Sequence, residues 1–208
     1  MDVIASRKNP FVAAVRRVAD GEDRDRLLLD GLHLVEDARA AQVPIASAAF
    51  TARALASTDG KARRLATLLA GTGVRVVQVA DPVMDALSPT AHPSGVVAVA
   101  ARPRRALDEV IASGGATPLI VVAVDVQDPG NVGAIARVAE AAGATGFVAA
   151  GQSADPFGWK ALRGSMGSGL RLPTASGSWA VGSRRPLPIE PRSAFQPKGS
   201  ADLSLIHI

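Results

Sequence analysis

The sequence predicts an α/β protein, with a small three-layer α/β unit at the N-terminus, residues 1–103, followed by a parallel-sheet unit, residues 104–175. Short aliphatic runs alternate with stretches of helical spacing in both units, and this alternation is typical of sheets covered by helices. The run Leu119–Val124 is aliphatic throughout, as are strands buried on both faces of a parallel sheet. Apolar residues make up 48% of the 208, which is enough to bury a sizeable core.

The first unit is expected to alternate strands with helices. Apolar residues recur near helical spacing over 11–18 and predict a short amphipathic helix. The basic segment 102–105 is interpreted as the joint between the two units, and a helix over 105–113 is expected to follow it. Further strands are expected over 27–29, 45–50, 74–79 and 96–100, and further helices over 32–41, over 65–69 and from Asp81 onward.

In the second unit, local signals place a helix soon after the strand Leu119–Val124. Asp128 can accept hydrogen bonds from the free N–H groups of a helix start, and Pro129 is tolerated at the first helical position. The Ala-rich stretch that follows predicts a helix over 129–142, and Gly143 is a common left-handed stop.

The remainder of the second unit repeats this pattern. Asp155 and Pro156 resemble the first capping pair and predict a helix of about ten residues that breaks near Gly164. Strands over 145–150 and 170–174 complete a β-α-β-α-β order. This order implies right-handed parallel crossovers.

Several classes of protein are excluded by composition. The chain has no cysteine, which excludes a disulfide framework, a thiolate metal site and a cysteine nucleophile. Its three histidines lack a metal-ligand spacing, so no metal is expected. No apolar run approaches the roughly 20 residues of a membrane helix, and the N-terminus has no apolar signal core. A cytoplasmic protein without a membrane segment is therefore expected.

The charge balance is basic but ambiguous. The net charge is +4, and 19 of the 23 basic residues are arginine. Arginine suits phosphate, and a basic balance is typical of proteins with a nucleic-acid partner. An Ala- and Arg-rich composition also follows from a GC-rich genome, so composition leaves both interpretations open.

The most informative segment follows the strand Leu119–Val124, where Gly130-x-x-Gly133 begins a helix. Backbone N–H groups at such a helix start can bind anions at the carboxyl edge of a sheet. The segment lacks the G-x-G-x-x-G pattern of dinucleotide sites, which makes that use the weaker alternative. Asn131 and Arg137 interrupt an otherwise apolar helix. From the residues alone, Arg137 is either a surface residue with a packed stem or an anchor for an anion.

The block that begins at Asp128 and ends around Gly143 resembles the first signature motif of the SpoU (TrmH-type) RNA methyltransferases. Its sequence is Asp-Pro-Gly-Asn-Val-Gly-Ala-Ile-x-Arg, followed by Ala, Ala and Gly-Ala. The resemblance continues through Arg163-Gly-Ser-Met-Gly167 and ends at Leu172-Pro173. Three segments of the first unit are similar to the substrate-binding domain of this family, and together the matches cover residues 6 to about 175 in order. These three segments are 6–10, 29–38 and 87–98.

This resemblance implies both a fold and an activity. The second unit would be a partial SPOUT-type domain, the trefoil-knot methyltransferase fold, and the complete domain would form a homodimer through the knot. The family transfers a methyl group from S-adenosylmethionine to a ribose 2′-hydroxyl of rRNA or tRNA. Its motif gives the catalytic role to Arg137, and Asn131 would fix either that arginine or the ribose. A guanidinium is always protonated, so orienting a phosphate beside the hydroxyl is an easier role for Arg137 than general-base catalysis.

The resemblance also indicates residues that would bind RNA. Arg163 and Ser165 would hold RNA phosphate in the second unit. Arg7, Lys8 and Asn9, in the opening segment of the first unit, are further candidates for RNA binding. Phosphates need cationic partners, and the 2′-hydroxyl distinguishes RNA from DNA.

Residues 176–208 differ from the rest of the chain. They contain four prolines and little periodicity, so an aberrant, disordered tail is expected. The last residues, Leu203–Ile208, would be encoded by CTGTCTCTTATACACATC, which looks like a transposon-end adapter used to build sequencing libraries. We therefore interpret this segment as an artefactual end on a truncated reading frame.

Members of the family continue with a Gly-Asn-Glu loop and a Ser-Leu-Asn segment, which hold most of the methyl donor. The chain has neither motif after Pro173. Cofactor-binding residues are therefore unassigned, and weak or absent binding of S-adenosylmethionine is expected. Two alternatives stay open at this point: a non-catalytic RNA-binding protein that uses the first unit, and a dinucleotide-binding enzyme with its site at Gly130.

Overall fold

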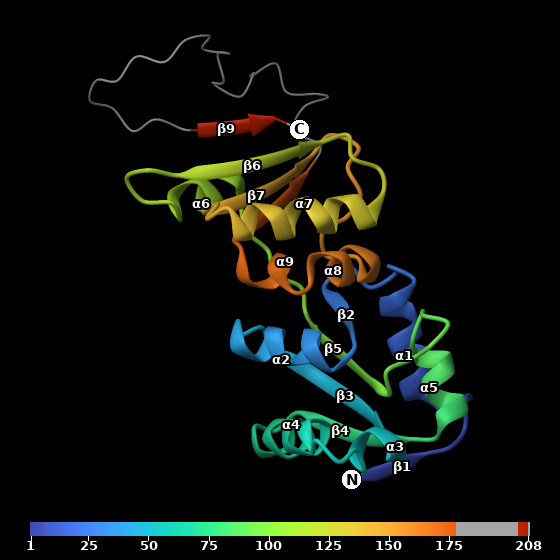
Figure 1. Cartoon of the computed structure of the whole chain (residues 1–208). Coiled ribbons are helices and arrows are strands. Elements are labelled where there is room, and N and C mark those ends of the chain that lie inside the picture. Colours follow the sequence, from blue (N-terminus) through green and yellow to red (C-terminus); the bar gives the residue numbers. More distant parts are fainter. Residues whose placement is uncertain (178–203, 208) are drawn as a thin grey trace, which may run out of the picture.

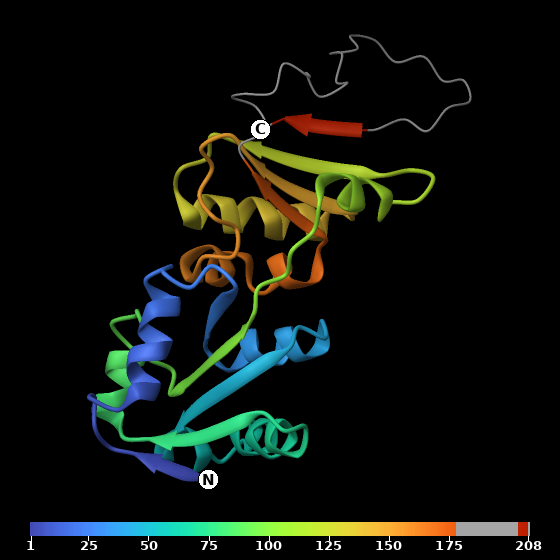
Figure 2. The same cartoon turned by 180° about the vertical axis from the view of Figure 1, so that it is seen from behind.

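The computed structural model describes residues 1–177 and 204–207 and arranges them around two sheets (Figure 1). We refer to residues 1–101 as the N-terminal unit and to residues 107–177 as the C-terminal unit. A single linker, residues 102–106, joins them, and Figure 2 shows its path from behind.

The N-terminal unit has a mixed sheet with helices on both faces. Its strands are β1 (Asp2–Ile4), β2 (Arg26–Asp30), β3 (Ile45–Thr51), β4 (Arg75–Val79) and β5 (Val96–Ala101). Its helices are α1 (Pro10–Ala19), α2 (Leu32–Ala40), α3 (Ala52–Leu55), α4 (Lys61–Gly71) and α5 (Asp81–Leu87). The strand order is β1-β4-β3-β5-β2, with β5 antiparallel to β3 and β2 and the other pairs parallel. All the expected elements occur here, and β1 and α3 are additional.

Strand β5 shows why this unit has three layers. Its side chains alternate between the two faces of the sheet, as the period of two requires. Val97 and Val99 pack with α1 and α5, in a core that includes Phe11 and Met84. The alternate residues of β5 pack with α2 and α4 on the opposite face, beside Val35. The prediction of a three-layer α/β unit is confirmed.

The C-terminal unit contributes three strands to a four-stranded parallel sheet, and the fourth strand comes from the end of the chain. Its strands are β6 (Leu119–Val124), β7 (Gly146–Ala150) and β8 (Thr174–Gly177), and its helices are α6 (Leu107–Ala112), α7 (Pro129–Ala141), α8 (Trp159–Ser165) and α9 (Ser168–Arg171). The pairs β6–β7 and β7–β8 are parallel, which confirms the predicted β-α-β-α-β order. Helix α7 packs on one face of the sheet and α6 on the other. Helices α8 and α9 lie between α7 and the N-terminal unit in both views (Figures 1 and 2).

The ends of α7 follow the local signals of the sequence. The Asp128 carboxylate accepts a hydrogen bond from the Asn131 N–H at 2.7 Å, and Pro129 occupies the first helical position. Gly143, two residues after the end of α7, adopts a left-handed conformation with φ +78°. These ends were predictable because each depends on adjacent residues only.

Two expectations for the following segment are wrong. Asp155 and Pro156 do not begin a helix, because the Asp155 carboxylate accepts a hydrogen bond from the Phe157 N–H in a turn and α8 starts at Trp159. Residues 170–174 do not form a strand, since Ser168–Arg171 is the short helix α9 and the strand β8 begins only at Thr174. Leu170 packs into the core of the N-terminal unit, a distant contact that local periodicity does not report.

Residues 178–203 and 208, which make up most of the expected disordered tail, lie outside the described residues. Within the described part, Ser176 and Gly177 belong to β8, and Ser204–His207 forms β9, a strand parallel to β6. Strand β9 gives the C-terminal sheet the order β8-β7-β6-β9. The expectation of a segment without regular structure is therefore wrong for these residues.

Two further findings concern the described residues alone. No helix among them is long and apolar enough to cross a membrane. They also contain no group of three or more His, Asp or Glu side chains placed to hold a metal ion.

Candidate active site

The loops at the carboxyl ends of β6 and β7 are joined by hydrogen bonds. The Gln152 N–H donates to the Asp125 carboxylate at 2.8 Å, and the Val126 N–H donates to the Ser153 hydroxyl at 3.1 Å. The Ser153 hydroxyl in turn lies 2.7 Å from the Ala150 carbonyl, to which it donates. Ligands of parallel sheets bind at this edge, so these bonds give the candidate site a fixed wall.

Asp125 has an unusual backbone. Its φ is +56°, in the left-handed region that residues other than glycine rarely adopt. Gly151 opposite it has φ +65°, and a Cβ there would come within 3.1 Å of the Asp125 carboxyl carbon. Sequence reasoning did not single out Asp125, although a carboxylate directly after a buried strand was a usable signal.

Helix α7 presents both predicted catalytic side chains. Asn131 and Arg137 are exposed, and neither side chain makes a hydrogen bond or ion pair with another residue in the part of the chain that the structure describes. They are six positions apart, which corresponds to about 9 Å along the axis and to different faces of the helix. The structure therefore does not bring Asn131 against Arg137.

The first turns of α7 are closely packed against α8, on the face that also carries Arg137 one turn after Gly133. A Cβ on Gly133 would lie 2.8 Å from the Ser165 backbone nitrogen and still closer to the Ala161 carbonyl oxygen. On α8, a Cβ on Gly164 would lie 3.0 Å from the Gly130 carbonyl oxygen. Gly133 on α7 and Gly164 on α8 thus allow the two helices to approach.

The residues predicted to bind phosphate from α8 have different surroundings. Arg163 is half exposed, and its Nη1 lies 3.8 Å from the Asp30 carboxylate in β2. Ser165 is buried, at 1% exposure; its hydroxyl donates to the Leu162 carbonyl at 2.9 Å and accepts from the Gly169 N–H at 3.4 Å. The predicted contact of Ser165 with RNA is therefore inconsistent with this structure, because the hydroxyl is used within the α8–α9 turn.

Asp30 is a buried carboxylate at the contact between the units. Its side chain is 4% exposed and accepts a hydrogen bond from the Ser88 hydroxyl at 3.1 Å. Burial raises the pKa of the Asp30 carboxyl, while the Ser88 hydrogen bond and the charge of Arg163 act in the opposite direction. The Asp30–Arg163 pair thus gives Arg163 a structural partner as well as a solvent-facing side.

Arg7, Lys8 and Asn9 lie at the start of α1. The Arg7 Nε donates to the Pro82 carbonyl at 2.8 Å, and the Asn9 side chain accepts from the Phe11 N–H at 2.9 Å as the helix cap. The other end of α1 lines a cleft beside the C-terminal unit, about 15 Å away for a helix of this length. The structure therefore does not bring these three residues together with Arg137.

A cleft of about 600 Å³ separates the end of α1 from the carboxyl edge of the C-terminal sheet. Four arginines line it, together with Trp159 and the loop residues Gly151 and Ser153. The four arginines are Arg24, Arg26, Arg102 and Arg104. Sequence reasoning missed Arg24 and Arg26, because the mixed charges of residues 22–26 are typical of any solvated loop.

Arg102 holds one wall of this cleft in place. Its Nη1 donates to the Asp155 carboxylate at 2.7 Å, and its guanidinium lies 5.0 Å from the centre of the Phe157 ring. Arg104 pairs with Asp25 on the other side of the linker. Arg26 lies 3.8 Å from the Asp23 carboxylate, so the cleft is basic but three of its four arginines already have a carboxylate partner.

An arginine of α9, Arg171, binds the carboxylate of Glu140 on α7, with Nε and Nη2 at 2.7 and 2.8 Å. The hydrogen bonds from Arg171 lower the pKa of Glu140, against the effect of burial. A carboxyl group whose pKa is lowered by folding stabilises the folded state at pH values above its unfolded pKa of 4.5. This contribution is lost as the pH falls through the lowered pKa of the folded state.

We expect this pair to give a pH-dependent stability difference between the unaltered protein and Glu140→Gln. The difference in the free energy of unfolding is expected to shrink between about pH 7 and about pH 3, because Glu140 becomes neutral in both states. Urea denaturation over this pH range measures it. A difference that stays constant would show that the charge of Glu140 does not contribute.

Comparison with known proteins places these features in a family. Residues 9–98 match the MRM3-like substrate binding domain, and residues 118–181 match the SpoU rRNA Methylase family. An uncharacterised tRNA/rRNA methyltransferase of Synechocystis sp. is 33% identical over 82% of this chain and 60% of its own length. The Bacillus subtilis 23S rRNA (guanosine(2553)-2′-O)-methyltransferase RlmP is 30% identical over 83% of this chain and 64% of its own length.

Solved structures agree with this assignment. An AdoMet-bound rRNA methyltransferase from Sinorhizobium meliloti superposes with a TM-score of 0.71 and 27% identity, over 84% of this chain and 64% of that one. The chain spans less than two thirds of the length of the curated relatives it matches. The two matched domains follow one another in the order that the motifs predicted, and the chain belongs to the SpoU family of RNA methylases.

Proposed function

We propose that this protein is an RNA 2′-O-methyltransferase, which transfers a methyl group from S-adenosylmethionine to a ribose 2′-hydroxyl of rRNA or tRNA. Arg137 is the observation that carries the proposal. Its guanidinium is exposed, has no hydrogen-bond or ion-pair partner among the described residues, and lies on a helix that the close contact of Gly133 with α8 holds in place one turn earlier. RlmP of Bacillus subtilis and the Streptomyces viridochromogenes 23S rRNA (uridine(2479)-2′-O)-methyltransferase, 37% identical over 48% of this chain, support this chemistry.

The role of Arg137 follows from the properties of the two reacting groups. A ribose hydroxyl is a weak nucleophile, so alignment contributes much of the rate. Arg137 cannot accept a proton, but it can bind the phosphate next to the hydroxyl with two parallel hydrogen bonds. Asn131, at the start of the same helix, can orient the ribose with its amide. Both residues act on RNA and hold it at the surface of α7.

S-adenosylmethionine supplies a methyl group on a positively charged sulfur. The described residues do not form a cradle for it. The loops at the sheet edge use the Asp125 carboxylate and the Ser153 hydroxyl for their own hydrogen bonds, and a side chain at Gly151 would meet Asp125. We therefore assign no cofactor-binding residue and derive no step through the cofactor.

RNA is expected to contact the N-terminal unit as well. This unit matches a substrate-binding domain, and Arg24 and Arg26 in the cleft join Arg7, Lys8 and Arg163 as candidate phosphate ligands. We further propose that the complete enzyme is a cytoplasmic homodimer joined through a knotted C-terminal domain, as the resemblance implies. The molar mass in solution, measured by light scattering, tests the dimer.

Methyl transfer to RNA tests the function directly. The 208-residue chain and a version extended with the remaining segment of RlmP are incubated with rRNA or tRNA and radiolabelled S-adenosylmethionine. We expect the extended protein to incorporate label that blocks alkaline cleavage at one nucleotide, as 2′-O-methylation does. RNA binding without incorporation would instead favour a non-catalytic RNA-binding protein.

We also expect the 208-residue chain to bind S-adenosylmethionine weakly or not at all, because its described polar groups at the sheet edge are used within the loops. Isothermal calorimetry with the pure chain measures this, with the extended version as the positive control. Micromolar binding by the shorter chain would contradict the expectation.

A further inference from the structure

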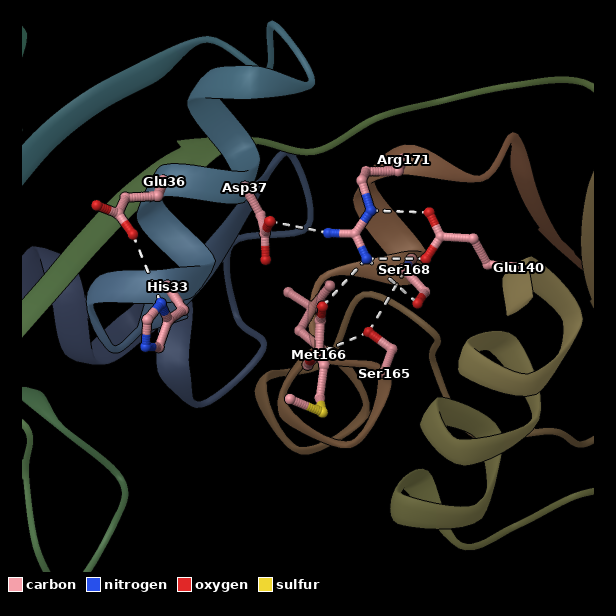
Figure 3. Close-up of polar contacts among 10 residues, drawn as sticks. His33, Glu36, Asp37, Glu140, Ser165, Met166, Ser168 and Arg171 are labelled. Atoms are coloured by element: carbon pink, nitrogen blue, oxygen red, sulfur yellow. Dashed lines mark hydrogen bonds and ion pairs between the residues drawn. The ribbon is translucent and has the colours of Figure 1, made fainter.

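Arg171 lies where three helices from the two units meet (Figure 3). Its Nη1 is 2.8 Å from the Asp37 carboxylate on α2, and its Nε and Nη2 donate to Glu140 on α7 at 2.7 and 2.8 Å. Nη2 also donates to the Met166 carbonyl at 3.2 Å. We call Arg171, Asp37 and Glu140 the Arg171 cluster. It joins the N-terminal unit to the helix that carries Arg137.

The backbone around the cluster is shaped for this contact. Gly167 has φ +81°, and a Cβ there would lie 2.7 Å from the Asp37 carboxyl carbon and 2.8 Å from the Arg171 Nη1. Only glycine lets Asp37 reach Arg171 at this point. Charge-assisted hydrogen bonds of bidentate geometry are among the stronger polar contacts in proteins.

An apolar contact lies beside the cluster. Phe157, Leu162 and Leu170 from the C-terminal unit are buried in the same core as Leu34 and Val35 of α2. Apolar packing is non-directional, whereas the planar guanidinium of Arg171 binds carboxylates only in a defined orientation. The cluster therefore supplies the directional part of the contact between the units.

Glu140 also lies next to Arg137. The two residues are three positions apart on α7, and side chains at this spacing are neighbours on a helix surface. An acidic residue at this spacing can pair with the arginine and compete with a phosphate for it. Arg171 binds both carboxylate oxygens of Glu140, so the charge of Arg137 stays available for a phosphate.

We propose that Arg171 is a positioning residue, which fixes α2 of the substrate-binding unit against α7 and occupies the carboxylate that would otherwise pair with Arg137. The part that concerns Arg137 rests on the proposed function. The part that concerns the contact between the units does not, and the two parts are tested separately.

Hydrogen exchange of the whole 208-residue chain tests the contact between the units. In Asp37→Lys a second cation faces Arg171, and we expect amides of α9 and α2 to exchange about tenfold faster, while those of β3 and β4 stay unchanged. Glu36→Lys is the matched control, because Glu36 pairs with His33 of the same helix at 3.5 Å (Figure 3). Asp37→Glu keeps the charge and is expected to restore most of the protection.

Two hydrogen-exchange results would overturn the proposal that the Arg171 cluster holds the two units together. An Asp37→Lys pattern equal to that of the unaltered protein would show that the cluster does not hold the units together. Equal acceleration in α9 and in the sheet of the N-terminal unit would show a general loss of stability instead of the release of α9.

Binding of a fluorescein-labelled RNA oligonucleotide tests the effect on Arg137. Arg171→Gln leaves Glu140 free to pair with Arg137 and is expected to weaken RNA binding about tenfold. Adding Glu140→Gln is expected to recover at least half of that loss in free energy. Equal weakening in the single and double variants would overturn the proposal for Arg137. If the unaltered protein bound no RNA, the proposed function would fail, and the exchange result would still decide the contact between the units.

Discussion

Replacing Arg137 with alanine is expected to lower the rate of methyl transfer by about 100- to 1,000-fold without unfolding the protein. A preorganised charged group at the reacting centre typically has an effect of this size. The fold should tolerate the change, because Arg137 is exposed and makes no side-chain hydrogen bond or ion pair with another described residue, and such surface substitutions typically change stability by about 0.5 kcal/mol or less. Arg137→Lys keeps the charge but loses the planar fork, so an intermediate rate is expected.

The measurement is the rate of label incorporation by the extended protein at saturating RNA. Arg53→Ala is the matched control, since Arg53 is an exposed arginine on α3, in the part of the N-terminal unit far from α7 (Figure 1). A full rate in Arg137→Ala, with incorporation still at the 2′-oxygen, would exclude the role that we assign to this arginine.

Replacing Gly133 with alanine is expected to destabilise the protein by about 1–3 kcal/mol, the usual cost of inserting a methyl group into a tightly packed contact. The new Cβ would meet backbone atoms of α8, including the Ser165 nitrogen at 2.8 Å, and a backbone cannot move aside as a side chain can. Thermal and urea denaturation measure the effect.

Gly71→Ala is the matched control for Gly133→Ala. Gly71 is also a helical glycine, but a Cβ there would meet nothing within 4 Å. Its replacement should leave stability equal or raise it by about 0.4–1 kcal/mol, since alanine restricts the unfolded chain. If both variants had the same stability, the close approach of α7 to α8 would have no energetic importance.

Features that depend on neighbouring residues were predictable from the sequence. The cap at Asp128, the stop at Gly143 and the strand Leu119–Val124 each carry their signal in the chain itself, and all three occur as expected. The motif around Arg137 identified the helix that carries the candidate site. Because an exposed arginine needs no packing partner, its position on α7 followed directly from the helix.

Features that depend on contacts between distant segments were not predictable. The local sequence pattern around Leu170 fits a helix as well as a strand. The packing of Leu170 into the core of the N-terminal unit decides between the two. Ser165 matched a motif, but its burial results from the packing of α7 against α8. In the sequence, Asp37 and Arg171 each have the features of an ordinary surface charge. Only the fold brings the Arg171 Nη1 to 2.8 Å from the Asp37 carboxylate.

The shared core beside α2 limits how this chain can be divided. A cut in the linker would separate the two sheets, but it would also remove Phe157, Leu162 and Leu170 from the core of the N-terminal unit. The surface left behind would be apolar and would favour aggregation. The N-terminal unit is therefore not portable by itself, and a protein engineer who wished to transfer it to another enzyme would have to supply a replacement for α8 and α9.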